Sequence, residues 1–232
     1  MLTIIIPCFN EEKNINKLLE RIDEILDKYS FLNVILVDNG SNDSTSKKIK
    51  DNIIYKNNKF KLVLVKKNIG YGYGILTGLK ASNTEYLSWT HADMQTDIED
   101  IPKSFLLYKD KLHSKKFIIK GRRKNRNKFD SFFTFCMSII SSTLTFLIIN
   151  DVNAQPKIFH RNFYEKLNNP PYDFMLDLYL VIKAKKLNYL ILEYPVYFSE
   201  RKFGTAKGGG SLKGKIILSY KTLIYLIGLR WK

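Results

Sequence analysis

The stretch Tyr86-Leu87-Ser88-Trp89-Thr90-His91-Ala92-Asp93-Met94-Gln95 changes from apolar and aromatic to polar within a few residues. Its first half has the composition of a buried strand, and its second half carries a carboxylate with a polar side chain two residues away on either side. In an extended segment, every second side chain lies on the same face. We therefore expect His91, Asp93 and Gln95 to converge at a strand end, in an arrangement that suits a divalent cation and a phosphate-bearing substrate.

Three further apolar runs upstream are also followed by polar residues and a helical pattern. Continuous apolar runs are typical of strands buried on both faces. The expected strands are residues 2–6, 34–37, 62–65 and 86–90, and the expected helices are 11–28, about 45–54 and about 74–81, with Asn10 and Asp43 as caps of the first two. Repeated strand–helix units predict an α/β fold with a parallel sheet, flanking helices and ligand sites at the carboxyl ends of the strands.

The second half of the chain is less regular. We expect a strand at 117–119, followed by a basic loop at 120–126. Residues 131–150 carry no charge and are long enough for a transmembrane candidate, but a polar stripe at helical spacing favours a helix packed on the protein or lying in the membrane interface. Residues 212–232 predict a basic amphipathic helix, for which a membrane surface and ordinary docking are both open.

Composition narrows the class of protein. The chain has 232 residues and 45% hydrophobic content, enough for one sizeable core. Its net charge of +16 favours an anionic partner such as nucleic acid, an anionic membrane surface or a phosphorylated substrate, although biased codon usage also explains part of the excess. Cys8 and Cys136 form no spacing motif and the N-terminus has no leader pattern, which indicates a reduced, intracellular protein.

Four polar clusters follow the first four expected strands, and together they carry a family resemblance. They are Pro7-Cys8-Phe9-Asn10-Glu11-Glu12, Val37-Asp38-Asn39-Gly40-Ser41-Asn42-Asp43-Ser44-Thr45, Lys67-Asn68-Ile69-Gly70-Tyr71-Gly72-Tyr73-Gly74 and the stretch from Tyr86 to Gln95. In this order and at these intervals, they resemble the inverting family-2 glycosyltransferases, most closely the dolichyl-phosphate mannose synthase-like branch. The resemblance covers nearly the whole chain. It implies the Rossmann-like GT-A fold, a mostly parallel mixed sheet with flanking helices.

The same resemblance implies a domain over 1–211, with a nucleotide-binding half at 1–100 and an acceptor half at 101–211, followed by the helix at 212–232. A UDP- or GDP-sugar is the implied donor. Its binding residues would be Pro7, Phe9, Asn10, Glu11, Asp38, Asn39, Asn68, Gly70 and Gly74. The family often has a second Asp where this chain has Asn39, which leaves the base open. The glycines would let the backbone approach the nucleotide closely, and their spacing does not fit a dinucleotide-binding G-x-G-x-x-G motif.

The family's D-x-D motif holds Mg²⁺ or Mn²⁺ against the donor diphosphate. Asp93 matches its metal-binding Asp, Gln95 matches the Gln of the mannose synthase-like branch, and His91 stands where the first Asp usually lies. The implied catalytic residues are Asp93 and Asp177, the latter as the general base for a hydroxyl acceptor. A lipid phosphate acceptor is already ionised and needs no base.

The acceptor side is expected in the second half, and its candidate phosphate- and acceptor-binding residues are Arg122, Arg123, Arg126, Gln155, Arg201, Thr205 and Lys207. The resemblance favours a polyprenyl-phosphate or lipid-linked acceptor at the cytoplasmic membrane face, with peripheral attachment to an anionic surface. A polysaccharide or lipopolysaccharide acceptor stays open, as does a homo-oligomer. A nucleic-acid-binding protein is disfavoured because aromatic residues do not interleave with the basic runs. A sugar-1-phosphate nucleotidyltransferase would need a Gly-rich basic motif after the first strand, which Pro7 to Glu12 lacks.

Overall fold

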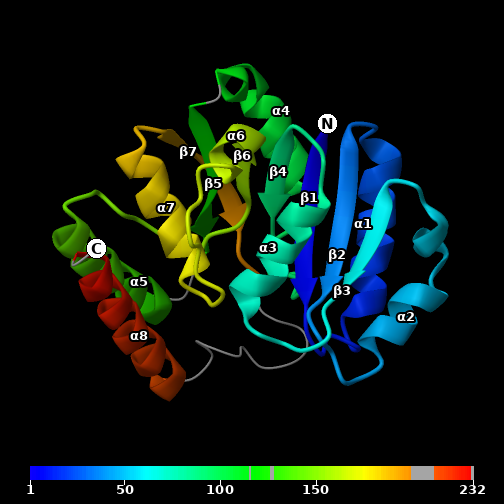
Figure 1. Cartoon of the computed structure of the whole chain (residues 1–232), viewed down its shortest axis with the longest axis horizontal. Coiled ribbons are helices and arrows are strands. Elements are labelled where there is room, and N and C mark those ends of the chain that lie inside the picture. Colours follow the sequence, from blue (N-terminus) through cyan, green and yellow to red (C-terminus); the bar gives the residue numbers. More distant parts are fainter. Residues whose placement is uncertain (115, 126–127, 200–211, 231–232) are drawn as a thin grey trace.

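The computed structural model describes residues 1–114, 116–125, 128–199 and 212–230, which form a seven-stranded sheet between helical layers (Figure 1). The strand order is β3-β2-β1-β4-β6-β5-β7. The strands are β1 (Leu2–Cys8), β2 (Leu32–Asp38), β3 (Phe60–Leu64), β4 (Tyr86–Trp89), β5 (Phe117–Lys124), β6 (Lys157–His160) and β7 (Leu190–Tyr197). Only β6 runs antiparallel to its two neighbours, so the predicted mostly parallel mixed sheet is confirmed.

Helices cover both faces of the sheet. They are α1 (Ile15–Lys28), α2 (Thr45–Asp51), the 3₁₀ turn η1 (Ile53–Lys56), α3 (Tyr71–Ala81), α4 (Asp100–His113), α5 (Lys128–Thr145), α6 (Arg161–Tyr164), α7 (Leu176–Lys186) and α8 (Leu212–Arg230). In β1, Ile4 and Ile6 join the core beneath α1 and α4, whereas Ile5 joins the core beneath α3 and α7. This alternation explains why the strands are apolar on both faces.

The first helix begins later than its pattern predicts. Asn10 was expected to cap it, but α1 begins at Ile15 after Asn14. Asn10 instead has a φ of +56° and its Oδ1 accepts a hydrogen bond from the backbone N–H of Asn42 at 3.0 Å. The prediction was wrong because residues 10–12 are used to join the loop after β1 to the loop after β2. The second cap is closer to its prediction, since Asp43 Oδ1 accepts from the backbone N–H of Thr45, the first residue of α2.

The prediction of a basic loop at 120–126 is wrong for residues 120–124. Residues up to Lys124 continue β5 and pair in register with β7, from Phe117–Leu190 to Lys124–Tyr197. Lys120 is buried in the sheet, where its Nζ lies 3.2 Å from Glu193 Oε1. Acidic groups from distant segments therefore allow basic residues to extend a strand beyond its apolar part.

The uncharged segment 131–150 forms most of α5, which packs against α8. Among the described residues, no helix has the length and apolar character needed to cross a bilayer. The segment therefore packs on the protein, as expected, and its contact with a membrane interface stays a prediction. Both helices nevertheless leave large apolar side chains exposed, among them Phe132, Phe135 and Ile139 on α5 and Ile216, Tyr220 and Ile224 on α8.

Candidate active site

The loops after β1 and β2 form one unit at the carboxyl edge of the sheet. The backbone N–H groups of Asn10 and Glu11 donate to Ser41 Oγ at 3.0 Å and to Thr45 Oγ1 at 2.9 Å. Asp38, at the end of β2, is buried, and its Oδ1 accepts from the backbone N–H of Ser41 at 2.9 Å. The predicted nucleotide residues Pro7, Phe9, Asn10, Glu11 and Asp38 thus lie on two adjacent, cross-linked strand ends.

Asn39 links this unit to the loop after β3. Its Nδ2 donates to the carbonyl oxygen of Gly70 at 2.9 Å and lies 3.5 Å from Asn68 Oδ1. Its Oδ1 is buried and has no hydrogen-bond partner among the described residues. Gly74 packs closely on this unit, because a Cβ there would lie 3.0–3.2 Å from side-chain atoms of Asn39 and Pro7.

The glycine cluster meets the protein's own backbone. A Cβ on Gly70 would lie 2.2 Å from the carbonyl oxygen of Tyr172, and one on Gly72 would lie 2.5 Å from that of Pro171. The backbone N–H of Tyr73 donates to the same Tyr172 oxygen at 2.9 Å. These glycines therefore bring the start of α3 against the segment before α7, which joins the two halves of the chain. Their expected close approach to a nucleotide stays a prediction.

The metal candidates lie in a turn after β4. The extended geometry assumed for His91, Asp93 and Gln95 is wrong, because β4 ends at Trp89 and Met94 has a φ of +56°. Asp93 Oδ1 accepts from the backbone N–H of Gln95 at 3.1 Å, and Gln95 Nε2 donates to the carbonyl oxygen of Ser199 at 3.2 Å. The described residues contain no group of three His, Cys, Asp or Glu side chains that could hold a metal ion alone.

His91 has an aromatic role that its sequence position did not predict. Its ring stacks on Tyr71, with centroids 5.3 Å apart, and Tyr71 stacks on Phe174 at 5.1 Å. His91 follows β4, Tyr71 is the first residue of α3, and Phe174 lies two residues before α7. The pKa of Tyr71 is raised well above its usual value, mainly by burial and further by the negative charges of Asp177 and Asp93.

The two adjacent candidate arginines differ. Arg122 is exposed, and its Nε lies 3.7 Å from Glu193 Oε2. Arg123 binds Asp151 through its side chain, with Nε 2.8 Å from Asp151 Oδ1, and its backbone N–H donates to Asp151 Oδ2 at 3.0 Å. Burial raises the pKa of Asp151, but the Arg123 contacts lower it more, so the pKa is below its usual value. Arg126, Arg201, Thr205 and Lys207 lie outside the described residues.

Asp177 lies at the centre of a buried polar cluster. Its Oδ1 accepts from Trp89 Nε1 at 3.2 Å and from Gln155 Nε2 at 3.0 Å, and it lies 3.2 Å from Lys157 Nζ. Burial lowers the pKa of Lys157 to about 8, against the opposing effect of Asp177. Gln155 and Asp177 were predicted as site residues, whereas Tyr71, Trp89 and Lys157 were not. The available signals were the position of Tyr71 in the glycine cluster, of Trp89 in the stretch from Tyr86 to Gln95, and of Lys157 two residues after Gln155.

Comparison with known proteins places this geometry in a family. The profile of glycosyl transferase family 2 matches residues 3–125. The chain is 23% identical over 237 residues to a dodecaprenyl-phosphate galacturonate synthase from Rhizobium johnstonii, covering 97% of this chain and 67% of that protein. It is 25% identical over 245 residues to a dolichol-phosphate mannosyltransferase from Pyrococcus furiosus, covering 99% and 64%. The chain thus spans about two thirds of the length of these relatives.

Solved structures share the fold. Glucosyl-3-phosphoglycerate synthase from Mycobacterium tuberculosis, in complex with Mn²⁺, UDP and glucosyl-3-phosphoglycerate, superposes with a TM-score of 0.72 at 15% identity, covering 99% of this chain and 79% of that one. A mannosyltransferase from Pyrobaculum calidifontis, in complex with GDP-Man and Mn²⁺, gives 0.67 at 19% identity, covering 97% and 64%. The predicted GT-A architecture is thereby confirmed.

Proposed function

The chain belongs to glycosyl transferase family 2, and from this premise we propose that it is an inverting glycosyltransferase that moves a sugar from a UDP- or GDP-sugar to a polyprenyl-phosphate or lipid-linked acceptor. The observation that carries the proposal is that Asp38 and the turn of Asp93 follow the carboxyl ends of β2 and β4, the two parallel neighbours of β1, at the edge where α/β folds bind ligands. The named substrates of the relatives, dodecaprenyl phosphate and dolichol phosphate, support the acceptor class.

On this proposal, the loops after β1, β2 and β3 bind the nucleotide. Asp38 accepts a hydrogen bond from the base, and Asn10 and Glu11 bind the ribose or base. Pro7, Phe9, Asn39, Asn68, Gly70 and Gly74 complete the pocket. Because Asn39 is held by Gly70, it shapes the pocket from a fixed position.

The residues after β4 fit a divalent cation. Asp93 supplies a partly exposed carboxylate, and Gln95 donates through Nε2, which leaves its Oε1 as an acceptor. Mg²⁺ and Mn²⁺ take one or two carboxylates together with phosphate oxygens, so a site without a cage of protein ligands suits them. Such an ion, when bound, would neutralise charge that develops on the leaving diphosphate. His91 is a weaker candidate ligand, because its ring lies against Tyr71.

The acceptor oxygen then attacks the anomeric carbon in line with the departing nucleotide. A phosphate monoester is largely ionised at neutral pH, so it needs no general base. Exposed Arg122 is the described arginine most available to bind an acceptor phosphate. We keep Arg126, Arg201, Thr205 and Lys207, which the family resemblance implies, as proposed phosphate ligands. A hydroxyl acceptor would instead require a base, for which Asp177 is the candidate that the resemblance implies.

The test of this function is a thermal-shift series with UDP-sugars and GDP-sugars, each with Mn²⁺, with Mg²⁺ and without metal. We expect metal-dependent stabilisation by one nucleotide class, and its loss in Asp93→Ala. Asp110→Ala is the matched control, because Asp110 is exposed on α4. The enzyme proposal fails if no sugar nucleotide stabilises the protein, or if Asp93→Ala responds like wild type. Product analysis with polyprenyl phosphate and with glycan acceptors separates the two acceptor classes.

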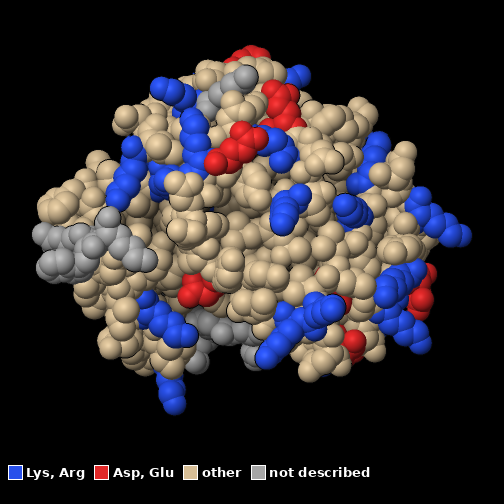
Figure 2. Space-filling model, viewed as in Figure 1, with Lys and Arg blue, Asp and Glu red and all other residues tan. Residues whose placement is uncertain are grey.

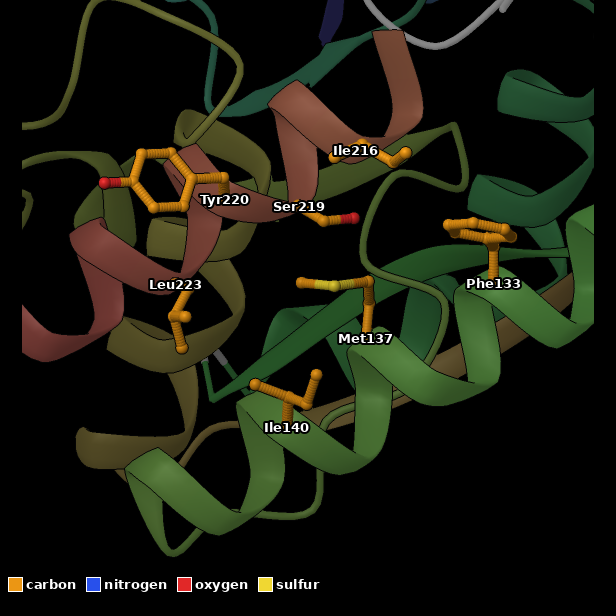
Figure 3. Close-up of a pocket in the computed structure, with 7 residues that line it drawn as sticks. All are labelled: Phe133, Met137, Ile140, Ile216, Ser219, Tyr220 and Leu223. Carbon is orange, nitrogen blue, oxygen red and sulfur yellow. The ribbon is translucent and has the colours of Figure 1, made fainter. Parts of the chain in front are cut away.

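We further propose that α5 and α8 attach the protein to the cytoplasmic face of an anionic membrane. Between these helices lies a groove of about 280 Å³, lined by Phe133, Met137, Ile140, Ile216, Ser219, Tyr220 and Leu223 (Figure 3). The segment from Leu212 to Arg230 contains basic residues but no acidic residue, and basic side chains lie over α8 in the lower left of Figure 2. Exposed apolar side chains beside basic ones are the combination that binds anionic bilayers.

Vesicle sedimentation tests this surface. We expect the protein to bind vesicles that contain anionic lipid, more weakly as salt rises, and the double variant Phe135→Glu/Ile224→Glu to lose binding. Ile53→Glu is the control, because Ile53 is 71% exposed on η1, whereas Phe135 and Ile224 are 61% and 52% exposed on α5 and α8. If the double variant abolishes self-association in size-exclusion chromatography and leaves vesicle binding intact, the face joins copies of the chain and the membrane proposal is wrong.

A further inference from the structure

Gln155 is a buried amide with one unused oxygen. Its side chain is 1% exposed, and its Oε1 has no hydrogen-bond partner among the described residues. Its Nε2 is fully engaged, because it donates to Asp177 Oδ1 at 3.0 Å and to Tyr71 Oη at 3.3 Å. A buried polar atom without a partner costs free energy, so it calls for a ligand.

Asp177 fixes which end of the amide faces inward. An ionised carboxylate only accepts hydrogen bonds, so the NH₂ group of Gln155 must face Asp177 and the carbonyl oxygen must face away. Lys157 pairs with Asp177, since their Nζ and Oδ1 atoms lie 3.2 Å apart and both side chains are buried. Lys157 also donates to the carbonyl oxygens of Val152 at 2.8 Å and Ala154 at 2.6 Å, which fixes the loop that carries Gln155.

The cluster lies between the two proposed substrate regions. Tyr71, which contacts Gln155, stacks on His91 near the proposed diphosphate site, and on Phe174 at the start of α7 in the acceptor half. The transferred sugar must lie between the diphosphate and the acceptor. A sugar hydroxyl is the donor most available to satisfy an unpaired amide oxygen there.

We propose that the Lys157–Asp177 ion pair holds the Gln155 amide in one orientation, so that Gln155 Oε1 accepts a hydrogen bond from a hydroxyl of the transferred sugar. Asp177 is then a positioning residue rather than a general base. Its buried Oδ1 already accepts hydrogen bonds from Trp89 and Gln155 and forms an ion pair with Lys157. This inference rests on the proposed glycosyltransferase function and deepens it by naming a residue that recognises the sugar.

The test separates sugar recognition from nucleotide binding. With Mn²⁺ present, calorimetry compares the affinity for UDP or GDP alone with that for the matching sugar nucleotide. Gln155→Met keeps the side-chain volume and removes the amide. We expect it to bind the nucleoside diphosphate like wild type and to bind the sugar nucleotide about tenfold more weakly, the effect of about one lost hydrogen bond. Equal losses for both ligands, or no loss for either, would overturn the proposal.

A second variant addresses Asp177. Asp177→Asn alone leaves Lys157 buried without a counter-charge, so it is combined with Lys157→Met to preserve folding. We expect the double variant to lose the same sugar-specific affinity, and the acidic limb of its kcat/KM profile against pH to match wild type. If sugar affinity is retained and the acidic limb disappears, Asp177 is the base and the inference is wrong. Absence of nucleotide binding in wild type would instead refute the proposed function itself.

Discussion

Asn39 shows how a single side chain joins the strand ends of the site. It follows Asp38 at the end of β2 and donates through Nδ2 to the carbonyl oxygen of Gly70 at 2.9 Å. A carboxylate at this position could not donate that bond. The amide therefore suits the local geometry, whichever base the pocket binds.

Asn39→Asp should destabilise the protein. The new carboxylate would be buried facing the Gly70 carbonyl oxygen and Asn68 Oδ1, so acceptors would face acceptors. We expect a loss of about 1–3 kcal/mol in the free energy of unfolding at pH 8, and a smaller loss near pH 5, where the new acid can protonate and donate. Urea unfolding measures both. Asn83→Asp, at an exposed position between α3 and β4, is the control and should change little. Equal stability of the two variants would show that the Gly70 contact contributes nothing.

Arg122 and Arg123 are neighbours with different expected roles. The Arg123 side chain is 11% exposed and paired with Asp151, whereas the Arg122 side chain is 63% exposed. Arg123→Met would leave Asp151 without its partner, so we expect a loss of about 3 kcal/mol and a Tm lower by about 6–12 °C. Arg122→Met should leave Tm nearly unchanged and weaken only acceptor binding. Thermal unfolding of the two variants checks this, and a reversed order would contradict it.

At the scale of elements, an ionic cluster joins α1 to α4. Glu99 forms ion pairs with two basic residues of α1. Lys28 Nζ lies 2.6 Å from Glu99 Oε1, and Arg21 Nη2 lies 2.8 Å from Glu99 Oε2. Its hydrogen bond with Lys28, more than that with Tyr29, lowers the pKa of Glu99 to about 2. This contribution to stability is present above pH 4.5 and is lost as pH falls toward 2. The pKa of Asp100 shifts in the opposite direction, because burial and the charge of Asp97 raise it to about 6.

Asp100→Asn should therefore stabilise the protein at neutral pH. A carboxyl whose folded pKa exceeds its unfolded value favours folding when protonated, so its benefit is complete below about pH 3.8 and is lost as pH rises through 6. The amide carries no such penalty. We expect Tm to rise by about 2–4 °C at pH 7.5, the shift that 1 kcal/mol gives in a domain of this size, and not to rise at pH 3.5. Thermal scans at both values decide, and a pH-independent difference would refute the cause.

Elements were predictable where one local property decides them. The strands from Leu2 to Trp89 are apolar because helices cover both faces, and that pattern is visible in the sequence. The predicted strand ended too early at residue 119, because basic residues such as Lys120 and Arg123 are typical of a loop. In the fold, Lys120 pairs with Glu193 and Arg123 pairs with Asp151, which lets β5 continue. The start of α1 was misplaced because Asn10 bonds a loop 32 residues away instead of its own helix.

At the scale of the whole molecule, the site was predictable in its strand ends and not in its centre. Asp38 and Asp93 follow apolar runs, so the topology alone places them at one edge. Lys157 was not predicted as a site residue, because its partner Asp177 comes from α7 and lies beside it only in the folded chain. The two halves meet at a seam, defined here as Gly70 and Gly72 packed against residues 171–173.

The seam makes a prediction about the whole molecule. Both Gly72, in α3, and Gly228, in α8, lie inside helices, where Ala is the better residue by about 0.5–1 kcal/mol. A Cβ at Gly72 would lie 2.5–2.9 Å from backbone atoms of Pro171, Tyr172 and Asp173, whereas one at Gly228 would meet nothing within 4 Å. Backbone cannot move aside as a flexible side chain can, so Gly72→Ala must separate the halves at the seam.

We expect Gly72→Ala to lower the free energy of unfolding by about 1–3 kcal/mol and Gly228→Ala to raise it slightly. Urea unfolding of both variants measures the difference, and a Gly72→Ala protein as stable as Gly228→Ala would show that the seam is not closely packed. Tyr71 lies between the two seam glycines, Gly70 and Gly72. Gly72→Ala should therefore also weaken the sugar-specific affinity assigned to Gln155.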